Sequence, residues 1–299
     1  MHTATLILVS VLFAVAAPSG FYQDAAAPHP ADKHWEQSLF DRVIENQKKN
    51  DAAMETYERI ERVETRKTSG ETQTTELKIS RVVPAGTGSG HLPVGPDGKA
   101  VDLTAYRAEL EKLEKSLVWA ADSGSAQRQA YEKIAKKRKE RADLIGAAKT
   151  AFIFTYIASE QRAGRTLLKY EMRPNPAFKP TSRSTSIYTR VRGTVWIDED
   201  SGELARIEGE VTDDISLGLF LAKVYKGSHF MQERYEMVPG LWLPTFSQYD
   251  FDGRKFLSSF ALHERTLYSN YRLVGAPKEA LELVRAELKQ ARASGSTAQ

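Results

Sequence analysis

The sequence predicts an α+β protein built on a curved antiparallel sheet, an unclosed β-barrel, that is covered by helices and carries an inserted helical hairpin. Between residues 151 and 263, apolar residues recur at every second position in short runs, as strands require. Turn signals such as Gly227-Ser228, Pro239-Gly240 and Asp252-Gly253 separate the later runs and indicate consecutive hairpins. In residues 35–47, 103–117 and 277–292 apolar residues recur every three or four positions, which is the spacing of helices.

The amino-terminal residues resemble a targeting segment. The run from Ala4 to Ala17 is apolar, contains no charge, ends in small residues and is too short to span a bilayer comfortably. We therefore expect residues 1–19 to be a cleaved secretory signal peptide and residues 20–34 a flexible leader. An uncleaved anchor is the alternative, because no Lys or Arg precedes the run. A bacterial periplasmic or secreted protein is the expected product.

Composition narrows the classes of function. The 299 residues are 41% hydrophobic and 27% charged, which is typical of a globular protein and excludes wholesale disorder. A net charge of +3 gives no reason to expect a nucleic acid as partner. The absence of cysteine excludes disulfides, thiolate metal sites, cysteine nucleophiles and acylation at cysteine, so the protein is not expected to be a lipoprotein itself. We expect one domain over residues 35–293 and a disordered tail over residues 294–299.

The first half of the chain predicts a helix, a hairpin and an insertion. Trp35, Leu39 and Val43 fall four apart and predict a helix over residues 35–47. Residues 57–66 and 72–83 alternate as paired strands. Residues 84–100 are rich in Gly and Pro and predict a mobile loop, followed by two helices, over residues 103–117 and 126–148, with a turn between them. The loop and this helical pair form the expected insertion, residues 84–148.

The second half predicts a meander of strands and a closing helix. The strand-like runs cover residues 151–160, 166–172, 186–198, 202–211, 219–226, 229–238, 241–251 and 255–263. In residues 277–292, Leu281, Val284 and Leu288 lie three or four apart and predict the final helix.

Three motifs resemble metal-binding or phosphate-binding sites, but each is better explained as an ordinary structural feature. His229 and His263 could meet across the sheet, but no second ligand has metal-binding spacing, so no metal site is expected. Asp198 and Asp200 alternate as in calcium loops, but the distal Glu is missing and a hairpin turn explains them better. The glycine-rich residues 86–90 lack the lysine of a phosphate-binding loop. We expect neither a cofactor nor enzymatic activity.

The second helix of the insertion is strongly basic. Residues 128–141 contain seven basic and two acidic residues, a local net charge of +5. A solvated helix face is one interpretation, and transient contact with an anionic membrane surface is the other. The candidate membrane-surface residues are Lys133, Lys136, Lys137, Arg138, Lys139 and Arg141.

The last third of the chain resembles LolA-like outer-membrane lipoprotein-sorting proteins, a class of periplasmic lipoprotein carriers. The resemblance rests on the strand with Trp196 and Asp198, the strand with Arg206, Glu208 and Gly209, the Lys226-Gly227 pair and residues 240–245, GLWLPT. It implies a strongly curved antiparallel sheet whose concave face is covered by helices and can hold lipid acyl chains. Residues 84–148 depart from the common pattern, so cargo and partner do not transfer with the resemblance.

Strand alternation independently indicates an apolar face that could bind such a ligand. Val191, Val195 and Ile197 share one face, and Ala205, Ile207 and Val211 share the corresponding face of the next strand. The expected ligand-binding residues are Ile207, Phe220, Val224, Phe256 and Phe260. We expect a non-enzymatic carrier or binding protein for lipid or lipoprotein acyl chains. The alternative is an envelope regulatory or scaffold protein that binds a protein partner through the helical insertion, with its half-barrel filled by its own helices.

Overall fold

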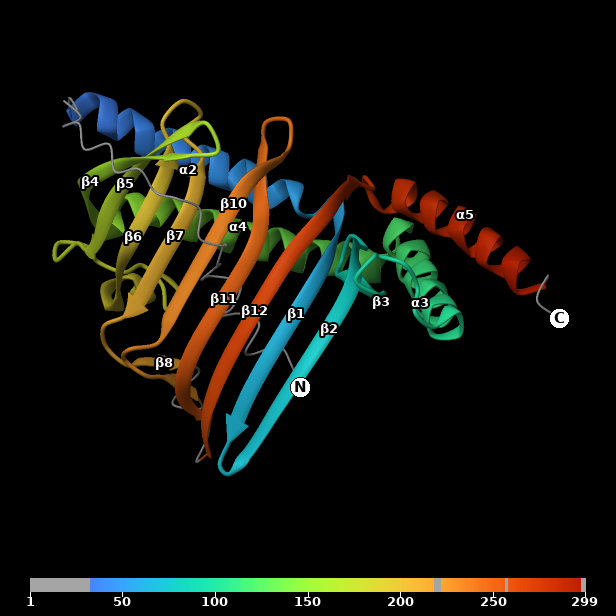
Figure 1. The fold of residues 1–299 in the computed structure, drawn as a ribbon. Coiled ribbons are helices and arrows are strands. Elements are labelled where there is room, and N and C mark those ends of the chain that lie inside the picture. The colour runs from blue at the N-terminus through green and yellow to red at the C-terminus, as the bar shows by residue number, and fades with distance from the viewer. Residues whose placement is uncertain (1–32, 218–221, 256–257, 297–299) are drawn as a thin grey trace. The chain divides into compact units, whose positions relative to one another are not determined.

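The computed structural model describes residues 33–217, 222–255 and 258–296 (Figure 1). The predicted signal peptide, most of the leader, and Phe220 and Phe256 lie outside these residues. Among the described helices, none is both long enough and apolar enough to cross a membrane.

The strands of the described residues form one large antiparallel sheet that does not close into a barrel, as the sequence predicts. Its order is β3-β2-β1-β12-β11-β10-β7-β6-β5-β4, with β9 joining β11 and β8 joining β9. The bounds are β1 Tyr57–Ser69, β2 Thr72–Pro84, β3 Ser89–Pro93, β4 Phe152–Arg162, β5 Arg165–Pro174, β6 Val191–Asp198, β7 Leu204–Val211, β8 Ile215–Leu217, β9 Ala222–Val224, β10 His229–Val238, β11 Leu241–Lys255 and β12 Ser258–Leu273.

The predicted helices are present with longer bounds. They are α2 Lys33–Ala53, α3 Leu103–Ala121, α4 Ser125–Ala151 and α5 Pro277–Ser296, with a short 3₁₀ helix, η1, at Thr185–Arg190. The Asp102 side chain caps α3 by accepting hydrogen bonds from the backbone of Thr104 and Ala105. Helix α5 includes the first three residues of the predicted disordered tail.

The chain divides into two compact units. Unit 1 comprises Met1–Asn50, Glu64–Glu76 and Arg141–Thr266, and unit 2 comprises Asp51–Val63, Leu77–Glu140 and Leu267–Gln299.

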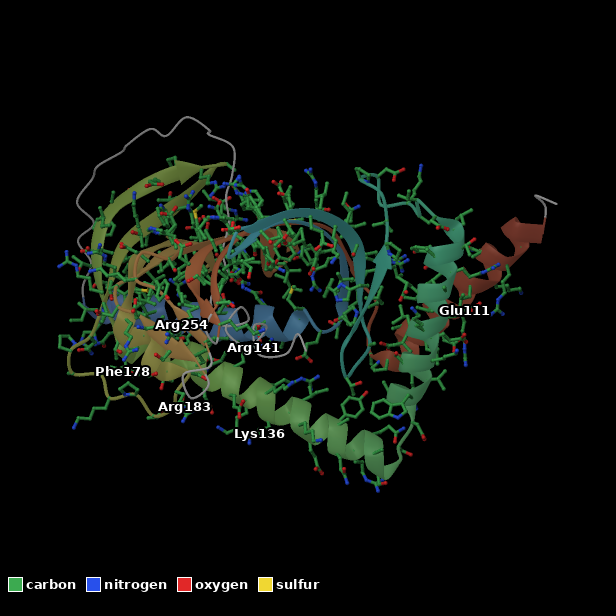
Figure 2. All side chains as sticks on the ribbon, turned by 90° about the horizontal axis from the view of Figure 1, so that it is seen from below. Glu111, Lys136, Arg141, Phe178, Arg183 and Arg254 are labelled. Atoms are coloured by element: carbon green, nitrogen blue, oxygen red, sulfur yellow. The ribbon has the colours of Figure 1, made fainter. Side chains whose placement is uncertain are left out.

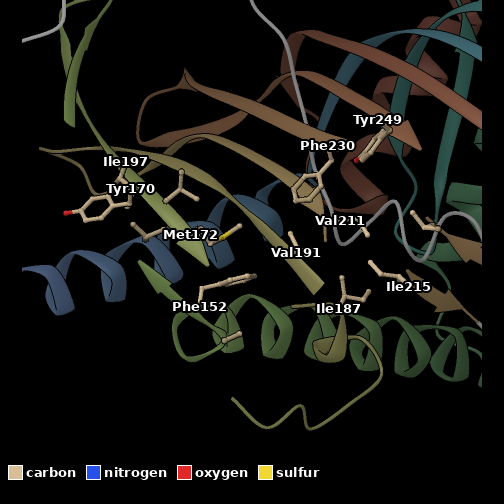
Figure 3. Packing of buried hydrophobic residues seen from close by; sticks show 14 of the residues in the cluster. Phe152, Tyr170, Met172, Ile187, Val191, Ile197, Val211, Ile215, Phe230 and Tyr249 are labelled. Carbon is tan, nitrogen blue, oxygen red and sulfur yellow. The ribbon is translucent and has the colours of Figure 1, made fainter. Parts of the chain in front are cut away.

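In unit 1, α2 and the end of α4 lie against one face of the sheet, which we call the helix-covered face (Figures 1 and 3). Side chains of this face form the main cluster, and Figure 3 labels members from several strands, together with Ile187 of η1. Its buried members are Leu39, Val43, Ala151, Phe152, Leu168, Tyr170, Met172, Ile187, Val191, Val195, Ile197, Val211, Ile215, Val224, Phe230, Tyr249, Phe251 and Leu262.

Unit 2 has its own apolar cluster, in which α3 packs mainly on α5 and β3. Leu110, Leu113 and Leu117 of α3 are buried against Val284 and Leu288 of α5. Part of the predicted mobile loop forms β3, which pairs with the end of β2. The structural reason is that Leu92 of β3 is fully buried in this cluster, a contact that the Gly- and Pro-rich composition does not reveal.

The expected turn at Asp252-Gly253 is wrong, because both residues lie inside β11. Gly253 pairs with Val224 of β9, and a Cβ at this position would lie 2.2 Å from the Lys223 carbonyl oxygen and 2.8 Å from the Phe260 ring. Glycine is therefore required here for close approach rather than for a hairpin.

Ala205 does not share a cluster with Ile207, contrary to the alternation of β7. The pairing of β6 with β7 shifts between Trp196 and Ile197, which leaves Ala205 as an extra residue in a β-bulge. Ala205 is buried instead in a small outer cluster with Leu167, Trp196 and Trp242.

Candidate functional site

The three described residues of the predicted ligand site all belong to the main cluster or pack against it. Val224 is a buried member, whereas Ile207 and Phe260 are partly buried at its margin. They come from β9, β7 and β12, so the sheet brings together residues that are far apart in the sequence.

Val224 and Phe260 meet at Gly253. Val224 pairs with Gly253 on one side and with Ile215 of β8 on the other. The ring of Phe260 lies over the space that a side chain at position 253 would occupy. The glycine thus lets an aromatic ring and a short edge strand approach the same point of the sheet.

Ile207 lies on the same face but belongs to a different set of residues paired across neighbouring strands. It pairs with Val195 of β6 and with Gln232 of β10. Near these residues the Phe230 ring approaches the backbone of Gly209 closely, because a Cβ on Gly209 would lie 2.1 Å from the ring. The outer end of the Phe230 ring therefore packs against the backbone of β7 at Gly209.

Large apolar side chains around the main cluster remain partly exposed. They come from α2, β4, the segment after β5, η1, β7 and β12, and they include Phe40, Phe154, Phe178, Tyr188, Ile207 and Phe260. Phe40 stacks on Phe154 with ring centroids 4.2 Å apart. We call this set the apolar margin.

Helix α2 covers this face with few buried apolar side chains. Only Leu39 and Val43 of this helix are buried members of the main cluster. Trp35 and Phe40 of α2 also pack against the cluster and remain partly exposed. The helix makes polar contacts as well: Asn46 Nδ2 donates to the carbonyl oxygens of Ser201 and Gly202, at 3.0 and 3.1 Å. The burial of Leu39 and Val43 contributes about 3–6 kcal/mol, and the partly exposed Trp35 and Phe40 add to this apolar attachment.

A buried polar cluster lies beside the end of α2. Asn50 is fully buried, donates from Nδ2 to Glu203 Oε2 at 2.7 Å and accepts from the Trp242 backbone N–H at 3.2 Å. Arg234 donates from Nε to Gln232 Oε1 at 2.5 Å and from Nη1 to the Trp242 carbonyl oxygen at 3.3 Å. The apolar alternation of the sequence did not predict these polar side chains on the helix-covered face.

Burial raises the pKa of Glu203 above its usual value of 4.5, although the Asn50 hydrogen bond and the charges of Lys49 and Arg234 oppose this rise. A carboxyl group with a raised pKa in the folded state contributes stability below the unfolded pKa and loses it as pH rises through the folded pKa. We expect Glu203→Gln to gain stability relative to the parent as pH rises from below 4.5 to neutral. Thermal unfolding across this range tests the expectation, and a difference independent of pH would contradict it.

The opposite, open face of unit 1 carries charged and aromatic side chains. Glu233 accepts from Arg162 Nη1 and Nη2 at 2.9 and 2.6 Å and from Arg206 Nη1 at 3.0 Å. The Arg206 guanidinium lies 5.0 Å from the centre of the Trp196 ring. Trp196 and Trp242, which have the opposite parity to the apolar set of their strands, thus belong to a second packed layer.

A polar groove of about 480 Å³ lies on this open face. Glu208, Glu210, His229 and Asp250 are among its lining residues. His263 Nδ1 lies 2.8 Å from Asp250 Oδ1, and His229 pairs with Asp250 in the ladder, so both histidines approach one carboxylate. Burial raises the pKa of Asp250, but hydrogen bonds from Gln248 and His263 outweigh this effect and hold the pKa below its usual value.

No group of three or more potential metal ligands occurs among the residues that the structure describes. Asp198 lies at the start of the β6–β7 turn, where its Oδ1 accepts from the Ser201 backbone N–H at 2.9 Å and from the Ser201 hydroxyl at 2.6 Å. These bonds close a hairpin turn, as the sequence predicts.

The predicted membrane-surface residues all lie on α4. Lys133 and the residues from Lys136 to Lys139 are exposed in the unit 2 part of the helix, and Lys136 points away from it (Figure 2). Arg138 Nε donates to Glu55 Oε1 at 2.9 Å. Arg141 is only half-exposed and belongs to unit 1, so it is the weakest member of the predicted set.

Unit 1 is thus an open antiparallel sheet with a helix-covered apolar face and a charged open face. No protein-family model matches the sequence, and no curated protein matches it significantly.

Comparison with solved structures finds three similar chains, each at a probability of 1.00. A LolA superfamily protein from Nitrosomonas europaea is 11% identical at a TM-score of 0.31, over 82% of this chain and 96% of that chain. A domain named for outer-membrane lipoprotein sorting from Vibrio parahaemolyticus is 12% identical at 0.31, over 78% and 93%. A DUF1329 family protein from Desulfovibrio piger is 11% identical at 0.27, over 79% and 92%. The similar structures include proteins of the class that the sequence resembles.

Proposed function

We propose that unit 1 is a non-enzymatic binding site for the acyl chain of a lipid or lipoprotein, and that the protein acts as an exported carrier. The observation that carries this proposal is the apolar margin, where large side chains pack on the main cluster and still remain partly exposed. An acyl chain laid along the margin would complete their burial. Helix α2 also supports the proposal, because its Trp35 and Phe40 pack on the main cluster and remain partly exposed, so that a ligand could extend their apolar contacts.

The gain from burying an acyl chain is sufficient for such a role. Each CH₂ group that leaves water contributes about 0.8 kcal/mol, so a chain of about 16 carbons has a gross driving force of roughly 12 kcal/mol. Ordering of the ligand and displacement of α2 oppose this gain. The remainder is compatible with reversible binding, as a carrier requires.

A charge in the apolar face should weaken the binding of an acyl chain. In Val224→Glu the carboxylate would lie where it loses its hydration, so we expect the affinity for a fluorescent fatty acid to fall by at least about tenfold. Arg254→Glu is the matched control, because Arg254 is exposed and pairs with Lys223, the neighbour of Val224, in the same ladder. Equal affinities of the two variants, both confirmed as folded by circular dichroism, would contradict the proposal.

Phe260→Gln tests the same face without a buried charge. Phe260 is only partly buried, so this variant should keep its fold and lose affinity more moderately than Val224→Glu. Arg206→Glu is unsuitable as an open-face control, since Arg206 is ion-paired with the buried Glu233.

A second candidate function is a scaffold that binds a protein partner. It is favoured by the position of Leu39 and Val43, which fill part of the helix-covered face with the chain's own side chains. A parent protein that binds no fatty acid would favour this candidate over the carrier.

We also propose that α4 attracts the protein to anionic membranes. Each basic residue near such a surface contributes about 1 kcal/mol, screened by salt. Replacing Lys133, Lys136, Lys137 and Lys139 with Gln should therefore weaken binding to phosphatidylglycerol vesicles by at least about tenfold at low salt. The matched control changes Lys112, Lys115, Lys278 and Lys289, which are exposed on α3 and α5 of the same unit. If both variants cosediment with the vesicles equally weakly, the effect depends only on the net charge of the protein. That result would contradict a specific role of α4.

A further inference from the structure

A hydrogen-bond donor without a partner lies inside the helix-covered face. Gln232 is 2% exposed, and its Nε2 atom has no hydrogen-bond partner among the described residues. Its other amide atom, Oε1, accepts from Arg234 Nε, which fixes the orientation of the amide. A buried donor of this kind is costly unless something supplies an acceptor.

The position of Gln232 joins this donor to the apolar site. The alternation of β10 places Phe230, Gln232 and Arg234 on one face, and Phe230 belongs to the main cluster. Gln232 pairs directly with Ile207, a residue of the apolar margin. The donor therefore lies within one strand spacing of the side chains that would contact an acyl chain.

Helix α2, which covers this face, does not supply a hydrogen-bond acceptor for Gln232 Nε2. Gln47 Oε1 of α2 is also buried and also has no partner among the described residues. Asn50, one turn further along, already uses its amide for Glu203 and for the Trp242 backbone. Gln232 Nε2 and Gln47 Oε1 are thus two of the buried polar atoms in the described part of unit 1 that the fold leaves without a hydrogen bond.

We infer that Gln232 is the polar anchor of the acyl-chain site, where its Nε2 donates a hydrogen bond to the carbonyl oxygen of the ligand. This inference rests on the proposed function and specifies its ligand as an apolar chain that ends in a carboxylate or an ester. Arg234, which is 4% exposed and holds the Gln232 amide in place, is a positioning residue that also adds positive charge near the ligand carbonyl. Such an anchor fixes the end of the chain, whereas the apolar margin binds its length without selecting a head group.

Gln232→Glu tests the anchor while preserving the acceptor for Arg234. The substitution replaces the Nε2 donor with a second carboxylate oxygen, so palmitate should bind about 10- to 100-fold more weakly than to the parent. Methyl palmitate should lose less, because an ester carries no charge to be repelled. A hexadecyltrimethylammonium ion, which has a chain of similar length and no acceptor, should bind the variant at least as well as the parent. Gln161→Glu on the exposed part of β4 is the control for added charge and should change none of the three affinities.

The outcomes separate this inference from the proposed function. A parent that binds none of the three ligands overturns both. Equal palmitate affinities of the parent and Gln232→Glu overturn the anchor alone, as does an equal loss for palmitate and for the quaternary ammonium ligand, which would indicate a general disturbance of the site. A loss of both palmitate and methyl palmitate supports a hydrogen bond to the carbonyl oxygen that the two ligands share, whereas a loss of palmitate alone indicates charge repulsion and overturns the anchor.

Discussion

Replacing Glu233 with alanine is expected to lower the free energy of unfolding by about 3–5 kcal/mol. The Glu233 side chain is 3% exposed and balances the charges of both Arg162 and Arg206 on the open face of the sheet. Its removal would leave the largely buried guanidinium groups of Arg162 and Arg206 without the carboxylate that they share, and Arg206 would keep its ion pair with Glu208. Urea unfolding followed by tryptophan fluorescence measures the loss, because Trp196 lies against Arg206 in the same layer.

Glu210→Ala is the matched control for this expectation. Glu210 pairs with Arg192 in a more exposed ion pair, with side-chain exposures of 29% and 61%. Exposed pairs of this kind contribute up to about 1 kcal/mol. A loss in Glu233→Ala no larger than that in Glu210→Ala would show that the open-face layer does not stabilise the sheet.

Gly193→Ala is expected to destabilise unit 1 by about 3 kcal/mol or more. A Cβ at this position would lie 1.9 Å from the backbone carbonyl oxygen of Glu208, and a backbone atom cannot rotate aside. Gly193 pairs with Gly209, against which Phe230 packs, so the required shift would also disturb the apolar face. The variant should therefore lose acyl-chain affinity together with stability.

Gly146→Ala is expected to change the stability of the same unit in the opposite direction. Gly146 lies within α4, and a Cβ there would meet nothing within 4 Å. Alanine is favoured over glycine in a helix by about 1 kcal/mol, so this variant should be slightly more stable than the parent. Thermal unfolding of both variants measures the contrast, and a tolerated Gly193→Ala would contradict the close packing of β6 against β7.

Hydrophobic spacing predicted most elements because it depends on local sequence. The spacing of Leu39 and Val43 predicted α2, and alternation placed Ile207 and Val224 on the face that carries the main cluster. Ala205 departs from this alternation, because a single bulged residue reverses the parity of the strand residues beyond it. The local sequence pattern does not predict such a bulge.

Long-range contacts were beyond prediction for a related reason. Leu92 forms a strand only because β2 and α3 bury it, and Gly253 serves close approach only because Phe260 and β9 meet there. Gln232 and Arg234 have the sequence pattern of polar residues in an ordinary strand, yet both are buried on the helix-covered face. Their role depends on partners that the sequence does not identify, such as Asn50 and Glu203 beside them.

Photoaffinity labelling with a fatty acid that carries a diazirine in its chain tests the central claim most directly. After irradiation, the modified peptides are identified by mass spectrometry. The proposed function predicts adducts on β7, β9 and β12, at or beside Ile207, Val224 and Phe260, and predicts that unlabelled palmitate competes for them. Adducts confined to the open face or to α3 and α5, or adducts that palmitate does not compete away, would contradict acyl-chain binding at the helix-covered face.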